Sequence, residues 1–175
     1  MKILLLCSTT DGHTWNICES IQKQIQEAKY EVLLVHIEDF EPNLLTESDA
    51  IMIGASIRYG KHNKKVYEFI NSYAKDLETK VSSFFSVNLV ARKSEKRTAE
   101  TNPYVRKFLK QMPWTPKQVG VFAGKLNYPL YGFFDRIMIQ LIMYMTKGPT
   151  NPTTVREYTN WEDVKDYTNN FIKLI

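Results

Sequence analysis

Hydrophobic and polar residues alternate along this chain in two different rhythms. Five short runs are mostly apolar at both odd and even positions, which is typical of strands buried on both faces of a sheet. Between these runs, apolar residues recur every three or four positions, as Ile17, Ile21 and Ile25 do, and this spacing predicts helices with one buried side. The predicted strands cover residues 3–7, 32–35, 50–53, 84–90 and 119–123.

Helical patterns join these runs. One predicted helix ends near Ala28, a second passes through Val66 and Ile70, a third covers residues 103–112, and the last starts near Asn160, a residue type that caps helices. Buried strands that alternate with helices form a parallel sheet covered on both faces. The pattern therefore predicts an α/β fold with a doubly wound, five-stranded parallel sheet.

One segment departs from this alternation. Residues 125–152 lie between the fifth strand and the last helix, where a five-stranded domain needs only a short loop. Within it, residues 133–146 read FFDRIMIQLIMYMT and predict a helix that is apolar nearly all round. Its length of about 21 Å is too short to cross a hydrocarbon layer of about 30 Å. We expect it either to pack on its own domain or to face a membrane surface or a large apolar ligand.

Composition indicates a single globular domain spanning residues 1–175, with 43% hydrophobic and 24% charged residues. The N-terminal apolar run is too short for a signal peptide, so we expect the protein in the cytoplasm. Its two cysteines, Cys7 and Cys18, lie within apolar patterns and are expected to be buried. No metal site is expected from this composition.

Positive charge is concentrated in one region. Residues 91–111 hold seven cations and two anions, a net charge of +5 in a chain whose total is +4. Such a patch indicates an anionic partner, either a nucleic acid, an anionic lipid surface or an acidic small molecule, or is simply a solvated helix face. Only Tyr104 and Phe108 supply aromatic rings among these cations, so we expect no nucleic-acid partner.

The loop after the first predicted strand carries the first candidate chemistry. Residues 8–14 include four hydroxyl side chains and Gly12, and they lead directly into a helix. Hydroxyls together with the free amides of a helix N-terminus suit a phosphate, although an ordinary capped turn has the same composition. The phosphate loop of NTPases and the dinucleotide fingerprint are both absent from the sequence. His13 occupies the position where a Cys-x5-Arg phosphatase needs arginine, and no Asp ends the third strand as a receiver domain requires.

Two further loops are predicted at the same edge of the sheet. Residues 54–60 read GASIRYG and residues 86–93 read SVNLVARK. Small residues and an aromatic ring from neighbouring strands suit a planar ligand. Together with the first loop, they resemble the FMN site of flavodoxin-like proteins, although Asp11 interrupts flavodoxin's own T-x-T-G-x-T pattern.

Longer blocks of sequence resemble one family with that fold, the menaquinone-dependent protoporphyrinogen IX dehydrogenases. The resemblance runs from the first strand into the final helix, and SVNLVARK is its most specific block. It implies a flavodoxin-like sheet with a long insertion, residues 125–152, associated with strand five. The matching blocks are the loop 8–14, IGASIRYG (53–60), SVNLVARK (86–93), EKRT (95–98), TN (101–102), RKFL (106–109), YP (128–129), DR (135–136) and LIM (141–143).

The resemblance implies that the chain oxidises protoporphyrinogen IX to protoporphyrin IX in haem synthesis, with six electrons passing through FMN to a membrane quinone. FMN carries this chemistry and its N5 accepts hydride, so no catalytic acid or base is assigned. Arg58, Tyr59 and His62 are expected near the flavin edge. The implied cofactor-binding residues are Ser8, Thr9, Thr10, Asp11, Gly12, His13, Thr14, Ser56, Ile57, Arg58, Tyr59, Gly60, Val87, Asn88, Leu89, Val90 and Ala91.

The implied substrate is a large apolar macrocycle that carries two propionates. We expect the insertion to cover the ring or to lie in a membrane interface, and nearby cations to bind the propionates or anionic lipid. The protein would then work as a peripheral protein on the cytoplasmic face of the bacterial inner membrane, with a homo-oligomer left open. The substrate or membrane candidates are Arg92, Lys93, Arg97, Tyr128, Arg136, Met138, Leu141 and Met145.

Two other functions fit the same patterns. A flavodoxin-type electron carrier or an NAD(P)H:quinone reductase would use the same fold, since a fold does not fix a function. Flavodoxins are typically acidic, so the basic patch and the apolar insertion count against a carrier. A membrane- or nucleic-acid-binding module without enzymatic activity is the second alternative, and the absence of bound flavin would favour it.

Overall fold

The computed structural model describes residues 1–175 and has one central sheet of five parallel strands. The strand order is β2-β1-β3-β4-β5, which confirms the predicted doubly wound α/β fold. The winding reverses between β1 and β3, and sheets of this kind bind ligands at that switch point. The strands are β1 (Lys2–Ser8), β2 (Glu31–His36), β3 (Ala50–Ser56), β4 (Val81–Asn88) and β5 (Gln118–Ala123).

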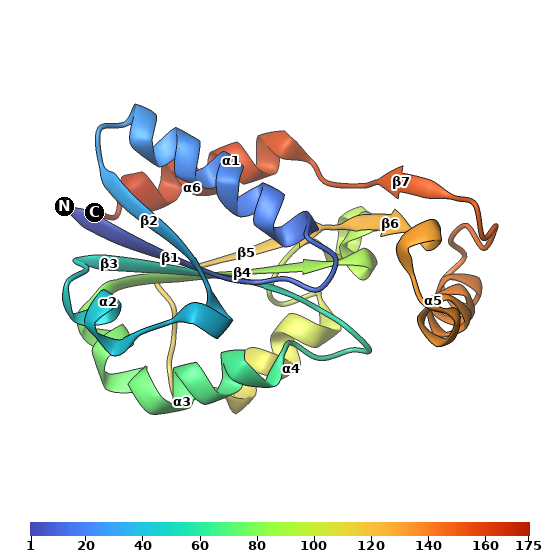
Figure 1. The fold of residues 1–175 in the computed structure, drawn as a ribbon, viewed down its shortest axis with the longest axis horizontal. Coiled ribbons are helices and arrows are strands. Elements are labelled where there is room, and N and C mark those ends of the chain that lie inside the picture. Colours follow the sequence, from blue (N-terminus) through green and yellow to red (C-terminus); the bar gives the residue numbers. More distant parts are fainter.

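Helices cover both faces of this sheet (Figure 1). Helices α1 (His13–Glu27) and α6 (Trp161–Ile172) lie side by side on one face. The opposite face carries α3 (Lys64–Thr79), α4 (Pro103–Gln111) and the short α2 (Pro42–Thr46). Short 3₁₀ turns follow several strands, at Ile37–Asp39, Leu89–Arg92, Ser94–Lys96 and Tyr128–Leu130.

Strand β1 shows why the apolar runs are continuous. Its residues Ile3 to Cys7 are all fully buried, and alternate side chains point to opposite faces. Ile3 and Leu5 belong to the cluster under α1 and α6, whereas Leu4 and Leu6 belong to the cluster under α3 and α4. Each such side chain contributes about 1.5–3 kcal/mol on burial, so both layers of helices are held on the sheet mainly by apolar packing.

Two elements of the sheet and its helices differ from the prediction. The fourth strand ends at Asn88, because the Asn88 side chain accepts a hydrogen bond from the Ala91 amide and starts a 3₁₀ turn over residues predicted as strand. Helix α2 was not predicted, since five residues give no periodic pattern. Asn160 caps α6 as predicted and accepts from the Glu162 amide.

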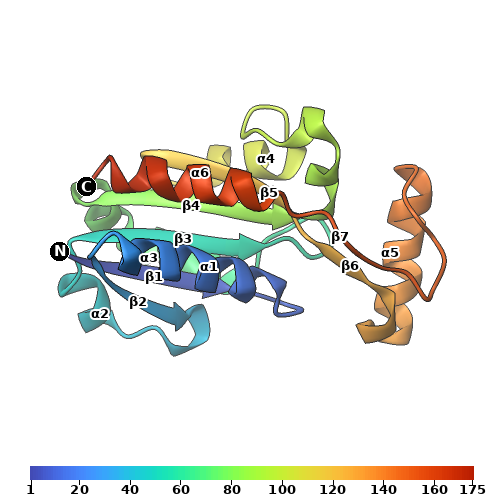
Figure 2. The same ribbon diagram turned by 90° about the horizontal axis from the view of Figure 1, so that it is seen from above.

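Residues 125–157 form an arm that extends from the carboxyl end of the sheet (Figure 2). Strands β6 (Lys125–Asn127) and β7 (Val155–Glu157) pair antiparallel as a narrow ribbon, which was not predicted. Helix α5 (Phe133–Met145) lies at the far end of this ribbon.

Helix α5 does not pack on the sheet, so the first of the alternatives stated for it, packing on the body of its own domain, is not observed. Only Ile139 and Met143 of the helix are buried, and they pack against Leu126, Tyr128 and Tyr131 of the arm itself. Most of its other apolar side chains are exposed. The helices of this structure are all too short, or not apolar enough, to span a membrane.

Candidate functional site

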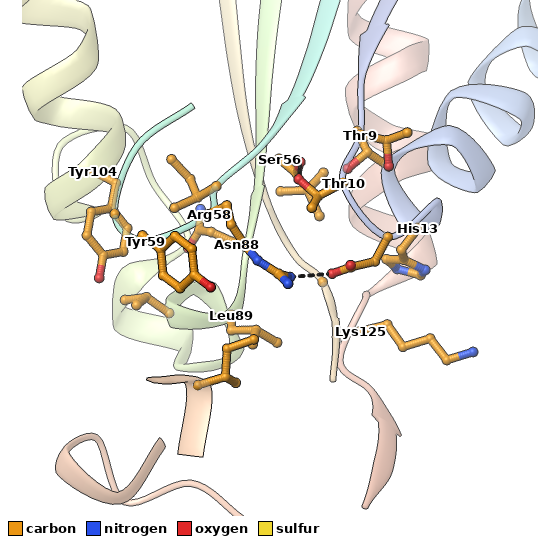
Figure 3. A pocket seen from close by; sticks show the side chains of 18 of the residues that line it. Thr9, Thr10, His13, Ser56, Arg58, Tyr59, Asn88, Leu89, Tyr104 and Lys125 are labelled. Carbon is orange, nitrogen blue, oxygen red and sulfur yellow. Dashed lines mark hydrogen bonds and ion pairs between the residues drawn. The ribbon is translucent and has the colours of Figure 1, made fainter. Parts of the chain in front are cut away.

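A pocket lies where the carboxyl ends of β1, β3 and β4 meet the arm (Figure 3). The three predicted loops converge there, as the parallel sheet requires. The pocket is lined by all the predicted cofactor-binding residues except Ser8, Gly12 and Ala91. Ser8 and Ala91 are buried in the frame behind it, and Gly12 forms the turn that shapes the first loop.

The first loop presents hydroxyl groups beside a free helix end. Gly12 adopts a left-handed conformation, with φ of 82°, and its amide donates to Thr9 Oγ1 at 3.1 Å. No side chain caps α1, so its first backbone amides are available to an anion. Thr10 Oγ1 lies 3.3 Å from Ser56 Oγ, which connects the first loop with the second.

The second loop is a tight turn with an unusual backbone. Tyr59 and Gly60 both have positive φ, 50° and 78°, and two backbone hydrogen bonds between Arg58 and Lys61 close the turn. A left-handed conformation costs a residue with a side chain about 1–2 kcal/mol. The Tyr59 side chain is 51% exposed and lines the pocket. The strained turn therefore places an aromatic ring at the pocket mouth.

Arg58 connects three parts of the site. Its guanidinium pairs with Asp11 of the first loop at 2.7 Å and with Asp135 of α5 at 2.5 Å. The same group lies 5.1 Å from the centre of the Tyr131 ring, within range of a cation–π contact. Arg58 therefore joins the phosphate-type loop, the turn after β3 and the arm.

A pair of buried amides shapes the third loop. Asn88 Oδ1 accepts from the Ala91 amide and from Asn102 Nδ2, both at 3.1 Å. Asn102 is fully buried, caps α4 through its Oδ1, and also donates to the Lys96 carbonyl. These bonds fix the chain on both sides of Leu89 and Val90, which line the pocket.

Six lining residues were not predicted. Gly124 and Lys125 follow β5 directly. Their position could have been predicted, because ligands bind at the carboxyl ends of parallel strands. Tyr104 comes from α4, where it was noticed only as an aromatic residue among cations. Tyr131, Ile139 and Ile142 come from the arm, and no sequence signal shows which way a separate helix folds back. The six are Tyr104, Gly124, Lys125, Tyr131, Ile139 and Ile142.

Three substrate or membrane candidates hold the fold instead. Tyr128 is fully buried, and its hydroxyl donates to the Pro149 carbonyl at 2.8 Å. Arg92 donates to the Leu89 and Thr146 carbonyls, and Arg97 donates to the Ala91 carbonyl. Tyr128, a substrate or membrane candidate, is therefore buried in the structure, and both arginines anchor backbone segments around the arm and the third loop.

The other candidates are more accessible. Lys93 is partly exposed, and Arg136 is partly buried beside the Tyr131 carbonyl, to which it donates at 3.3 Å. Three apolar candidates on α5 face outward, with 44%, 51% and 73% of their surface exposed: Met138, Leu141 and Met145.

The two histidines near the loops have different environments. His13 Nε2 lies 2.6 Å from the Thr159 hydroxyl, which is also within hydrogen-bond distance of the Ala123 carbonyl, at 2.8 Å. Burial lowers the pKa of His13. Burial also lowers the pKa of His62 to about 4, and His62 lies outside this pocket, contrary to expectation.

Comparison with known proteins extends this description. Residues 4–153 match the family model described as a flavodoxin domain. A flavodoxin from the domain Archaea and flavodoxin 1 from Bacillus cereus each superpose with a TM-score of 0.57 at 16% identity. The alignments cover 99% of this chain and 96% of the archaeal protein, and 100% and 99% for the Bacillus protein. At this identity the structures establish the fold alone.

A flavodoxin domain takes FMN, and the residues of the pocket fit this cofactor. Hydroxyls and helix amides in the first loop suit its phosphate. A Cβ atom at Gly12 would have no neighbouring atom within 4 Å, so there is space beside this loop for a ligand. Arg58 pairs with Asp11, which removes the repulsion that this carboxylate would exert on a phosphate. Tyr59 offers a flat ring at the pocket mouth.

Two curated relatives match nearly the whole chain. A protein named protoporphyrinogen IX dehydrogenase (quinone) from Leishmania major is 45% identical over 174 residues, which cover 99% of this chain and 75% of the relative. One with the same name from Escherichia coli strain K12 is 42% identical over 167 residues, which cover 95% of this chain and 92% of the relative. The chain therefore belongs to the flavodoxin-domain proteins and, among them, to the family of the quinone-dependent protoporphyrinogen IX dehydrogenases.

Proposed function

We propose that this chain oxidises protoporphyrinogen IX to protoporphyrin IX with FMN as cofactor and a quinone as final electron acceptor. The observation that carries this proposal is 42–45% identity, over nearly the full chain, to proteins with that name. The pocket supports it, because three loops and the arm of this same chain enclose a site for a planar cofactor.

The loops have distinct tasks in this proposal. Thr9, Thr10 and Thr14 and the first turn of α1 would hold the phosphate of FMN, and Ser56 and Asn88 would line the rest of its site. Tyr59 would contribute its aromatic ring to the binding of the planar part. When bound, FMN supplies the ability to take electron pairs from a carbon substrate and pass them to a quinone.

The chain supplies binding and orientation rather than proton transfer. His13 Nε2 is committed to Thr159, and His62 lies behind the pocket. The arm adds an apolar wall, because Tyr131, Ile139 and Ile142 line the pocket on the side opposite the sheet. A porphyrinogen, being large and mostly apolar, would contact this wall while its reacting edge faces the cofactor.

We further propose that the protein contacts membrane surfaces through α5. Four of its side chains are 72–80% exposed: Phe133, Phe134, Tyr144 and Met145. Helix α5 lies at the end of the molecule opposite both chain termini (Figure 2). An amphipathic helix with this much exposed apolar surface binds at a lipid–water interface. Quinones reside in membranes, so the contact would bring the site to its electron acceptor. Dimerisation through the same face is the competing explanation.

Anaerobic turnover tests the proposed activity. FMN-loaded protein is mixed with protoporphyrinogen IX and a soluble quinone, and porphyrin fluorescence is followed. The proposal requires fluorescence growth that depends on both FMN and quinone. If NADPH reduces the flavin rapidly and porphyrinogen does not, the chain is an NAD(P)H:quinone reductase. If the flavin reacts with redox proteins alone, it is an electron carrier.

A further inference from the structure

A second cavity lies next to the first, between the turn after β3 and helices α3 and α4. Its volume is about 440 Å³, within the size range of ligand pockets. The two cavities share Ile57, Gly60 and Tyr104 in their walls. The ring of Tyr104 lies 3.3 Å from the position that a Cβ atom would occupy at Gly60. Tyr104 and Gly60 therefore separate the two cavities.

The wall of the second cavity is strongly basic. Lys61, Lys64 and Lys107 line it, and its lining contains no acidic residue. The three lysines come from three separate elements: the turn after β3, the start of α3 and the middle of α4. Lys64 pairs with Glu68, whereas Lys61 and Lys107 form no ion pair. The cavity therefore has uncompensated positive charge.

A buried polar atom lies in the same wall. His62 is only 5% exposed, and its Nδ1 donates to the Ser56 carbonyl at 3.1 Å. This bond fixes the neutral tautomer in which Nε2 is an acceptor, and Nε2 is buried without a hydrogen-bond partner. Buried polar atoms in folded proteins usually have a partner, so this wall has capacity for another hydrogen bond. A bridging water would satisfy both Nε2 and an anionic acceptor beside it.

Two of the arginines expected to bind propionates, Arg92 and Arg97, donate to backbone carbonyls instead. Arg136 donates only to the Tyr131 carbonyl, at 3.3 Å, and its buried Nε has no partner. Lys125 lines the first pocket and forms no ion pair, but it is a single cation. The adjoining cavity on the far side of Tyr104 instead brings three lysines together. A ligand that reacts at the cofactor and extends past Tyr104 would place its end among them.

We propose that this lysine cavity is the subsite for the carboxylate-bearing edge of the substrate. The inference rests on the proposed function, whose substrate carries two propionates on one side of an apolar macrocycle. The macrocycle would contact the first pocket and the apolar wall of the arm, and the flexible propionates would pass Tyr104 toward Lys61, Lys64 and Lys107. Ammonium–carboxylate hydrogen bonds would then select the diacid over uncharged porphyrins.

The test measures binding rather than turnover. The full-length, FMN-loaded protein is titrated with protoporphyrin IX and, separately, with its dimethyl ester, and quenching of porphyrin fluorescence gives each Kd. The variant is K61Q/K64Q/K107Q. Its matched control is K65Q/K75Q/K110Q, which removes the same charge from exposed lysines of α3 and α4 that do not line the cavity.

The cavity variant should bind the diacid roughly tenfold or more weakly, because each lost charged hydrogen bond weakens binding severalfold. Its affinity for the ester and for FMN should equal that of the wild type, and the control variant should bind both porphyrins normally. Unchanged diacid affinity in the cavity variant would overturn the subsite, and so would equal losses for diacid and ester.

The result is distinguishable from failure of the proposed function. Suppose that the wild-type protein turns over porphyrinogen but the cavity variant binds the diacid normally. The proposed function then stands and the subsite is refuted. Selective, lysine-dependent binding of the diacid by a protein that does not oxidise porphyrinogen retains the subsite as a carboxylate site and loses the function.

Discussion

The guanidinium of Arg58 and the carboxylate of Asp135 form an ion pair that joins the turn after β3 to the helix at the end of the arm. The two residues are 77 positions apart in the chain. Because Arg58 also pairs with Asp11, one side chain sets the distance between the arm and the loop that would hold the cofactor phosphate.

Replacing Arg58 should therefore affect both the cofactor and the arm. In Arg58→Gln, Asp11 is left uncompensated beside the phosphate, so we expect FMN affinity to fall about tenfold, a loss of about 1.4 kcal/mol. Hydrogen exchange should increase in α5. Flavin fluorescence gives the Kd, and Asp135→Asn serves as the comparison, since it should loosen α5 and leave FMN affinity nearly unchanged. Equal FMN affinity in wild type and Arg58→Gln would contradict this role.

The strained backbone at Tyr59 predicts opposite effects on stability and binding. Tyr59→Gly should raise the free energy of unfolding of the FMN-free protein by about 1 kcal/mol, because glycine adopts positive φ without steric cost. The same change should weaken FMN binding, since the ring is lost. Tyr59→Phe keeps the ring and should behave like the wild type in both urea unfolding and FMN titration. A Tyr59→Gly protein that unfolds more easily would show that the turn is not strained.

His62 predicts a loss of stability in acid. Its pKa in the folded protein is about 4, below the ordinary value of 6.5, so folding favours the neutral imidazole. The contribution of His62 to the free energy of unfolding is fully present above about pH 6.5. It is lost as the pH falls from 6.5 through 4, by roughly 3 kcal/mol in total. Urea unfolding at pH 7 and pH 4 measures this. His62→Gln should remove most of the part of this pH dependence that His62 causes. If the variant and the wild type lose the same stability between pH 7 and pH 4, His62 is not the group responsible.

The buried Asn102 should be costly to replace. Asn102→Ala removes the cap of α4, leaves the Lys96 carbonyl without its donor and deprives Asn88 Oδ1 of one of its two donors. We therefore expect a loss of about 2–4 kcal/mol in unfolding free energy. Asn160→Ala, which removes only an exposed cap from α6, should lose about 1 kcal/mol. Equal losses would mean that the amide pair beneath the third loop adds nothing beyond capping.

The exposed face of α5 predicts membrane binding. Phe134→Glu/Met145→Glu should reduce partitioning onto vesicles that contain anionic lipid several-fold, because two apolar contacts are replaced by charges that the surface repels. Leu174→Glu is the control, since Leu174 is also exposed but lies at the chain terminus, at the other end of the molecule. Co-sedimentation measures the effect. If the double variant instead changes a dimer into a monomer without affecting vesicle binding, the face is a subunit interface.

Much of the fold follows from local patterns. The continuous apolar run from Ile3 to Cys7 is predictable as a strand because both faces of the sheet are covered, and every residue in it is buried. The loops after β1, β3 and β4 are also predictable, since parallel strands bring their carboxyl ends together.

The arm was harder to predict because its partners are remote or absent. The composition of α5 shows that the helix is apolar, but not that it contacts Tyr131 and Leu126 of the arm rather than the sheet. Tyr128 has a hydroxyl that suits either a ligand or the Pro149 carbonyl, and only the three-dimensional structure distinguishes them. The lysine cavity joins three elements that are separate in sequence, so spacing alone gave no sign of it.

The stoichiometry of electron transfer tests the central claim most directly. Anaerobic oxidation of protoporphyrinogen IX by catalytic amounts of FMN-loaded protein should consume three quinones for each porphyrin formed, because six electrons leave the substrate and each quinone takes two. No porphyrin should form without FMN or without quinone. A protein that reduces quinone from NADPH at normal rates and forms no porphyrin above the FMN-free background would contradict the assignment.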